Sequence, residues 1–339
     1  MLGTANQFPS QFDGDFIPAL GVSKFRYINP ALFLKTKRTI EDSGATHLIL
    51  EHPYFGWLGI MLKKACKLKL IIHSHNIESL RFKTMHKWWW KILWHYEKTL
   101  HRNADINFFI TDEDKSYAIQ NFGLSESKCH TITYGIEMAN APTLEDKLGA
   151  RKLLETLYHI QPAENILLFN GTLSYPPNLQ ALDHIVEEIN PQLLQTKNYK
   201  YKIIICGKGL PVGYKNLEQY SSENIIHAGF VDDVSIYFKA ADVFLNPTVD
   251  GGGIKTKIVE ALGYNNSVVS YASGAIGVPA ELTGNKLHVI RDNDSKQFVA
   301  SILSIKKEEL IPVGFFNHFY WANIAAKAAS ILQQPFYQK

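Results

Sequence analysis

The chain has 339 residues, of which 46% are hydrophobic and 20% are charged, and its net charge is +3. This composition is that of an ordinary globular protein long enough for two domains, and so small a net charge gives no basis for general nucleic-acid binding. The three cysteines are odd in number and far apart, which argues against a disulfide framework and fits a reducing compartment: Cys66, Cys129 and Cys206.

The sequence also bears on location. Its start, "MLGTANQFPSQFDGDF", lacks the basic end and apolar run of a secretory signal, and no apolar run is long enough to cross a bilayer. We therefore expect a cytoplasmic protein that can still contact the inner face of a membrane peripherally.

Short apolar, β-branched runs alternate with helical patterns along the chain. The first four predicted strands are 46–52, 67–75, 106–111 and 130–135. After a polar segment at 140–164 the pattern resumes with six more: 165–171, 200–209, 224–229, 242–247, 266–271 and 287–290. Alternating strands and helices predict an α/β fold with parallel sheets, and two such runs predict two Rossmann-like domains. We place them at 1–150 and 151–318, with a terminal helix in 319–339.

One predicted strand ends in "HSHNIESLR", which places His75 and Arg81 just beyond a strand end, where open α/β sheets bind their ligands. A histidine there can donate to a phosphate or sugar oxygen or relay a proton. A structural histidine with satisfied hydrogen bonds is the alternative. The spacing of His73 and His75 also suits a metal, but the sequence reveals no third ligand, so no metal site is predicted.

Three consecutive tryptophans stand in "KWWWKILWHYEK", residues 87–98. At about 100° per residue, one arc of the helical wheel collects the apolar side chains and is predicted to face the core: Trp88, Trp89, Ile92, Leu93, Tyr96 and Leu100. Trp90 and Trp94 fall outside that arc among lysines, which is typical of a helix lying on an anionic membrane surface. Packing against another helix or a partner subunit is the alternative.

The most informative stretch is "DGGGIKTKIVEALGY", residues 250–264, where a glycine run follows a predicted strand and opens a helix. Free N–H groups at a helix start favour phosphate, and Lys255 and Lys257 add positive charge. Glu260, further along the helix, can accept hydrogen bonds from vicinal hydroxyls, as acidic residues do for ribose. A glycine turn entering a surface helix with a solvated glutamate is the alternative.

An ordered set of segments resembles the retaining GT-B glycosyltransferases of family 4. In the second half these are "FNGTLSYPPN", "IIICGKG", "HAGFVDD", "YFKAADVFLNPTVDGGGIKTKIVEALGYNNSVVS" and "FYWANIAAKAASIL", and in the first half "IIHSHNIESLRF" and "ADINFFITDEDK". The resemblance implies two Rossmann-like domains facing a cleft, and transfer of a sugar from a nucleotide donor to a glycan or lipid-linked acceptor. It implies no metal and no other cofactor, and a last helix that returns to the first domain.

The resemblance also implies roles for single residues. Glu260 matches the second glutamate of the family's paired-glutamate motif, which binds ribose, whereas Gly252 replaces the first. Gly253, Ile254 and Lys255 would present N–H groups to the diphosphate, and Lys255 or Lys257 would neutralise it. Thr172 and Asn178, after Gly171, stand where the family usually has arginine and lysine. Backbone near Gly207, Gly209 and Phe230 would contact the base. His75 matches a family histidine close to the transferred sugar, and Arg81, Trp90 and Trp94 would lie on the acceptor or membrane side.

One departure from the family pattern and two alternative functions remain. No β-rich run precedes 46–52, so we expect the first strands of the first domain to be short or missing. An epimerase of the same fold would need paired carboxylates, which the loops of the first half do not offer. A nucleotide-sugar-binding protein without transferase activity would bind the donor and leave it intact.

Overall fold

The structure is a computed structural model that describes residues 1–4, 14–250, 253–306 and 309–334. The chain forms two compact units, Met1–Ile132 and Thr133–Lys339, which we call unit 1 and unit 2. The division falls before the predicted boundary at residue 150, because Tyr134, Met138 and Leu154 pack in the core of unit 2.

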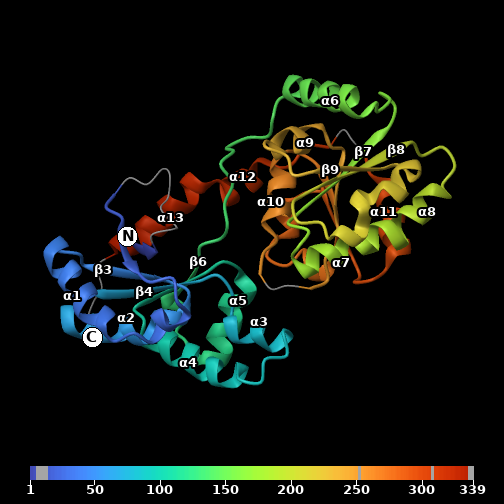
Figure 1. Ribbon diagram of the computed structural model, residues 1–339. Helices are drawn as coiled ribbons and strands as arrows, with labels where there is room; N and C mark the ends of the chain where they lie inside the picture. The colour runs from blue at the N-terminus through green and yellow to red at the C-terminus, as the bar shows by residue number, and fades with distance from the viewer. Residues whose placement is uncertain (5–13, 251–252, 307–308, 335–339) are drawn as a thin grey trace. The chain divides into compact units, whose positions relative to one another are not determined.

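Unit 1 is built on a parallel sheet in the order β3-β4-β5-β6 (Figure 1). A separate parallel pair, β1-β2, precedes it, so two short strands exist that the sequence did not predict. The elements are β1 (Leu2–Thr4), β2 (Ile17–Leu20), α1 (Ala31–Ser43), β3 (His47–Glu51), α2 (Gly56–Cys66), β4 (Lys69–Ser74), α3 (Glu78–Thr84), α4 (Trp90–Asn103), β5 (Ile106–Phe109), α5 (Asp112–Tyr117) and β6 (Cys129–Thr131).

The sheet of unit 1 is held by helices through apolar side chains. Leu50, Leu70 and Ile72 pack with Leu100 of α4, while Leu58 and Leu62 of α2 pack with α1. In the parallel register Glu51, the last residue of β3, lies directly opposite His73 on β4. This register brings the polar residues that follow the two strands to the same edge of the sheet.

Unit 2 contains a six-stranded parallel sheet in the order β12-β11-β10-β7-β8-β9 (Figure 1). Its elements are α6 (Leu144–Tyr158), β7 (Asn165–Asn170), α7 (Pro176–His184), α8 (Asn190–Leu194), β8 (Tyr201–Cys206), β9 (Ile225–Gly229), α9 (Val234–Ala240), β10 (Val243–Asn246), α10 (Thr256–Gly263), β11 (Ser267–Tyr271), β12 (Leu287–Ile290), α11 (Ser295–Ser304), α12 (Val313–Phe319) and α13 (Trp321–Gln333).

Successive residues of the central strands of unit 2 feed two separate cores. Ile166 and Leu168 of β7 pack with α9, α10 and α12 on one face, whereas Leu167 and Phe169 pack with α7 and α11 on the other. Side chains alternate between the faces of a strand, so a strand covered on both sides is apolar throughout. This is why the predicted continuous apolar runs form the buried strands of the sheet.

All ten predicted strands are present, each within a few residues of its expected limits. The C-terminal segment is helical, as α12 and α13, and Ile136 bridges to Tyr320 at the start of α13. None of the helices in the described ranges has the length and apolar character needed to cross a bilayer.

Candidate functional sites

The loops that follow β7 and β8 in unit 2 pack tightly against each other. At Gly207, φ is +150°, and an added Cβ would lie 1.9 Å from the carbonyl oxygen of Gly171. At Gly209, φ is +81°, and a Cβ would meet Ser174 at 2.9 Å. These glycines are therefore required by the contact between two loops of the protein itself. The sequence interpretation had assigned them only to contact with a base.

A lysine from α10 reaches this pair of loops. Lys257 Nζ donates to Asn178 Oδ1 at 2.9 Å, and Asn178 Nδ2 in turn donates to the carbonyl of Thr172 at 3.0 Å. The same ammonium lies 5.0 Å from the centre of the Phe169 ring. Over the part of the chain that the structure describes, Lys257 forms no ion pair with a carboxylate.

The two lysines of this segment are held in an environment that disfavours their charge. Burial, with a contribution from the nearby Lys255, lowers the pKa of Lys257 to about 7. Burial also lowers the pKa of Lys255 to about 8, although Asp250 opposes the shift. A bound anion would restore favourable surroundings for both ammonium groups, so this pair of lysines is suited to bind a multiply charged anion.

Lys255 also precedes the first turn of α10 as its N-cap residue, and its side chain makes no capping hydrogen bond. The N–H groups of that first turn thus lack a side-chain acceptor at the cap. Gly253 has a φ of +68°, a conformation that glycine adopts readily. Ile254 packs beside the core of unit 2, and Gly252 lies outside the described residues.

Glu260 lies one turn after Lys257 on the same helix. Tyr134 donates its hydroxyl hydrogen to Glu260 Oε1 at 3.0 Å. Burial raises the pKa of Glu260, while the hydrogen bond from Tyr134 acts in the opposite direction. Oε1 is therefore oriented by Tyr134, and the second carboxylate oxygen can accept a further hydrogen bond.

The remaining predicted residues of unit 2 are differently exposed. Phe230, directly after β9, has 69% of its surface exposed, while Thr172 is exposed beside Gly171. The structure thus brings Gly171, Thr172, Asn178 and Lys257 together and places Glu260 on the same helix as Lys257. Tyr134 was missed by sequence reasoning because it is distant from α10 in the chain.

In unit 1, two histidines donate to one carboxylate at the end of the sheet. His75 Nε2 lies 2.7 Å from Glu51 Oε2, and His73 Nδ1 lies 3.0 Å from the same oxygen. Although burial raises the pKa of Glu51, the hydrogen bonds from the two rings outweigh it and hold the pKa at about 2. His75 is therefore oriented by an ionised carboxylate that the sequence did not reveal.

A second carboxylate, Glu78 at the start of α3, is buried beside this group. Glu78 Oε2 accepts hydrogen bonds from the Tyr54 hydroxyl and from Arg81 Nε, each at 2.8 Å. Burial raises the pKa of Glu78, but the nearby His52, the hydrogen bond from Tyr54 and the charge of Arg81 bring it to about 2. Arg81, predicted to contact an acceptor, thus has Glu78 as its ion-pair partner within unit 1.

Glu97 of α4 fixes the start of α3. Its two carboxylate oxygens accept from the backbone N–H groups of Glu78 and Ser79, each at 2.8 Å, and its side chain is fully buried. Burial raises the pKa of Glu97 to about 7 in spite of these hydrogen bonds. Glu97 thereby replaces the N-cap side chain that α3 lacks and positions Glu78.

The predicted orientation of α4 was wrong in part: Leu100 is buried and Trp89, Leu93 and Tyr96 are half-buried, as predicted, but Trp88 and Ile92 are exposed. The helix begins only at Trp90, so Trp88 precedes it, and Trp88 and Ile92 have 83% and 65% of their surface exposed. Trp94, predicted to face outward, is half-buried: its Nε1 donates to the Tyr117 hydroxyl at 3.0 Å. The helical-wheel prediction placed the most apolar arc in the core. In the structure, the hydrogen bonds of Glu97 to the backbone of α3 bury Glu97 instead, and part of the apolar arc faces solvent. Trp90 is also half-buried, and its ring lies 5.0 Å from Lys83 Nζ.

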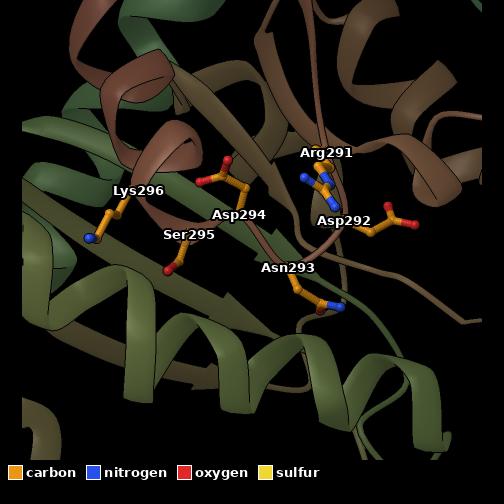
Figure 2. Close-up of a pocket in the computed structure, with 6 residues that line it drawn as sticks. All are labelled: Arg291, Asp292, Asn293, Asp294, Ser295 and Lys296. Atoms are coloured by element: carbon orange, nitrogen blue, oxygen red, sulfur yellow. The ribbon is translucent and has the colours of Figure 1, made fainter.

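A shallow hollow of about 390 Å³ lies along residues 291–296, between β12 and α11. Figure 2 shows that its side chains fan out in different directions and do not converge on a common point. Asp292 accepts from the N–H of Ser273, and Asp294 caps α11. Since the acidic groups serve the local backbone, this hollow has no candidate catalytic arrangement.

Two family profiles match the sequence and together span most of it. The profile described as "Glycosyltransferase Family 4" matches residues 9–140, and "Glycosyl transferases group 1" matches residues 164–308. The chain is 24% identical over 262 residues to a chitobiosyldiphosphodolichol beta-mannosyltransferase of Candida albicans, covering 71% of this chain and 54% of that protein. It thus spans about half the length of this relative.

Solved structures with the same fold include enzymes and a nucleotide complex. Sucrose-phosphate synthase from Thermosynechococcus elongatus superposes with a TM-score of 0.68 at 15% identity, over 92% of this chain and 79% of that one. Anabaena HepE in complex with UDP also gives 0.68 at 15% identity, over 91% and 83%.

Proposed function

The chain belongs to the group 1 and family 4 glycosyltransferases, and from this premise we propose that it moves a sugar from a nucleotide-sugar donor to a glycan or lipid-linked acceptor in cell-surface polysaccharide synthesis. Its fold is GT-B, as the sequence predicted. The observation that carries the proposal is the buried cation of Lys257, held by Asn178 at the carboxyl edge of the parallel sheet of unit 2.

The donor diphosphate would bind at the start of α10. Lys255 and Lys257 supply positive charge there, and the first-turn N–H groups add the partial charge of the helix dipole. Both lysines have lowered pKa values, so a diphosphate would be bound with uptake of protons when the pH is above about 7. Gly253 and Ile254 would bring backbone N–H groups close to the phosphate oxygens.

The nucleoside would be bound by groups beside the diphosphate. Glu260, held by Tyr134, would accept hydrogen bonds from the ribose hydroxyls. The exposed backbone near Gly207, Gly209 and Phe230 would contact the base. HepE was solved with UDP, which makes UDP the first nucleotide to test.

Unit 1 would supply the acceptor side. Glu51 orients His75, and an imidazole paired with a carboxylate can take a proton from an acceptor hydroxyl or donate to a sugar oxygen. We include retention of anomeric configuration in the proposal because the resemblance to family 4 implies it. The anomeric proton of the isolated product, observed by NMR, tests this part directly, and an inverted product would contradict it.

A basic, apolar patch of unit 1 supports peripheral binding to an anionic membrane. Met85, Trp88 and Ile92 are exposed, and Lys83, Lys87 and Lys91 stand among them. Exposed tryptophan and aliphatic groups with interspersed lysines favour an anionic bilayer surface over a neutral partner. This patch replaces the pair Trp90 and Trp94 that the sequence suggested.

The proposal is tested by a thermal-shift titration with nucleoside diphosphates and nucleotide sugars, followed by analysis of the donor after incubation with candidate acceptors. A ligand at a hundred times its Kd should add about 2.7 kcal/mol to the unfolding free energy. Stabilisation by one nucleotide and release of its sugar to an acceptor are expected. Binding without any loss of donor would indicate a nucleotide-sugar-binding protein, and no binding would contradict the donor site.

A further inference from the structure

Three potential metal ligands converge at the carboxyl edge of the sheet of unit 1. The ligand atoms of Glu51, His73 and His75 all lie within 4.8 Å of one another. Glu51 and His73 are opposite residues on β3 and β4, and His75 follows the end of β4. The pairing of β3 with β4 therefore places Glu51 beside His73, and the chain directly after β4 places His75.

The chemistry of these groups is that of a metal site. Two imidazole nitrogens and one carboxylate oxygen form a donor set that holds zinc in proteins and leaves a fourth position for water or another ligand. A metal ligand must be unprotonated, and a carboxylate meets this condition at neutral pH.

We propose that Glu51, His73 and His75 form a binding site for one divalent transition-metal ion of the zinc class. This inference rests on the geometry of three side chains and not on the proposed glycosyl transfer. With an ion on Nε2 and the hydrogen on Nδ1, His75 would act as a ligand and would not take a proton from an acceptor.

Binding needs only a small rearrangement. In a tetrahedral zinc site, ligand atoms about 2.0–2.1 Å from the ion are about 3.3 Å apart, close to the 2.7 and 3.0 Å that now separate Glu51 Oε2 from the two rings. Glu51 is mostly exposed and can rotate to open these distances. The hydrogens now donated by His73 Nδ1 and His75 Nε2 would move to the other nitrogen of each ring, so neutral rings would release no proton.

The surroundings distinguish this group from an ordinary surface ion pair. The His52 ring centre lies 4.2 Å from that of His75, and Glu78 Oε1 lies 3.6 Å from His52 Nδ1. His52 has a φ of +68° and a ψ of 159°, a strained conformation for a non-glycine residue. His52 thus forms one wall of the site. Its backbone N–H donates to the carbonyl of His73, which extends the pairing of β3 and β4 by one residue.

The site can be tested on the untagged full chain by titration with Co²⁺, read by its visible absorption, and by competition of Zn²⁺ against a chromophoric chelator. We expect one ion per chain and a loss of affinity of about tenfold or more in Glu51→Gln and in His75→Gln. His95→Gln, which removes another exposed histidine of unit 1, is the matched control and should bind like the parent chain. Glu51→Gln changes one exposed carboxylate, and an unchanged circular dichroism spectrum would show that its fold is retained.

The proposal is overturned if the parent chain binds no ion more tightly than expected for a single histidine. It is also overturned if Glu51→Gln and His75→Gln bind as tightly as His95→Gln, because the ion would then be held elsewhere, for example by the half-buried thiol of Cys66.

Discussion

The carboxyl edges of the two parallel sheets carry opposite kinds of charge arrangement. In unit 1, Glu51 is contacted by two histidines, and Glu78 by Tyr54 and Arg81, so the carboxylates already have hydrogen-bond donors. In unit 2, Lys257 contacts an amide oxygen and an aromatic ring, and burial lowers its pKa to about 7. Both sheets are parallel and have helices between their strands, so the difference shows that the loop residues decide which ligand each unit suits.

The largest effect should come from removing the cation of unit 2. Lys257→Met should weaken binding of the nucleotide donor by about 10- to 100-fold, because a charge-assisted hydrogen bond contributes about 1.5–3 kcal/mol. The same change should raise the unfolding free energy of the ligand-free protein by roughly 1 kcal/mol, since a buried charge is lost.

Calorimetric titration and thermal unfolding measure these two effects on the same samples. Lys239→Met, at a half-buried position of α9, is suited as a control for loss of charge alone. A Lys257→Met protein that is less stable and binds the donor normally would contradict the comparison.

In unit 1, the substitution Glu97→Gln should lower the free energy of unfolding and leave donor binding unchanged. Glu97→Gln keeps one acceptor oxygen but leaves a backbone N–H of α3 without an acceptor, which costs about 1–3 kcal/mol. Urea unfolding measures the change, with the exposed Glu41→Gln as a control expected to cost less than about 0.5 kcal/mol. An unchanged midpoint for Glu97→Gln would show that Glu97 does not hold α3.

A smaller effect is expected from the predicted ribose contact. Glu260→Gln should weaken nucleotide-sugar binding by about tenfold, because it replaces a charged acceptor with a neutral one. Tyr134→Phe should have a weaker effect, since it removes only the group that orients Glu260. Equilibrium dissociation constants for both variants test this order, and a larger loss in Tyr134→Phe would reverse the assigned roles.

The smallest effect concerns the apolar patch at the start of α4. Trp88→Ala with Ile92→Ala should lower binding to vesicles that contain anionic lipid by several-fold and leave donor binding unchanged, because both side chains are exposed. Vesicle co-sedimentation measures this. Trp94→Phe retains the ring in the core and is the control. Equal sedimentation of the double variant and the parent chain would contradict membrane binding through this patch.

The sequence predicted the strands well, since continuous apolar runs such as 165–171 leave few alternatives to a buried strand. It also singled out Lys257 and Glu260 as candidate donor-binding residues, because both lie on a helix that follows a glycine run, and their roles stay a prediction. It did not identify Glu51 or Tyr134, which act on residues far away in the chain and are brought there by strand register and tertiary packing. The orientation of α4 was predicted only in part for a similar reason: Glu97 is buried through its bonds to the backbone of α3, which the apolar pattern does not indicate.

The pH dependence of donor binding tests the central claim most directly. A nucleotide sugar is the right ligand because its diphosphate is doubly esterified and does not titrate near neutrality. Since the ammonium form of Lys257 binds the diphosphate, calorimetric affinity for the parent chain should be constant below about pH 7 and fall as the pH rises above it. In Lys257→Met the affinity should be low throughout and fall only above about pH 8, through Lys255. An affinity that is independent of pH in the parent chain, or equal in the two proteins, would contradict a donor site built on Lys257.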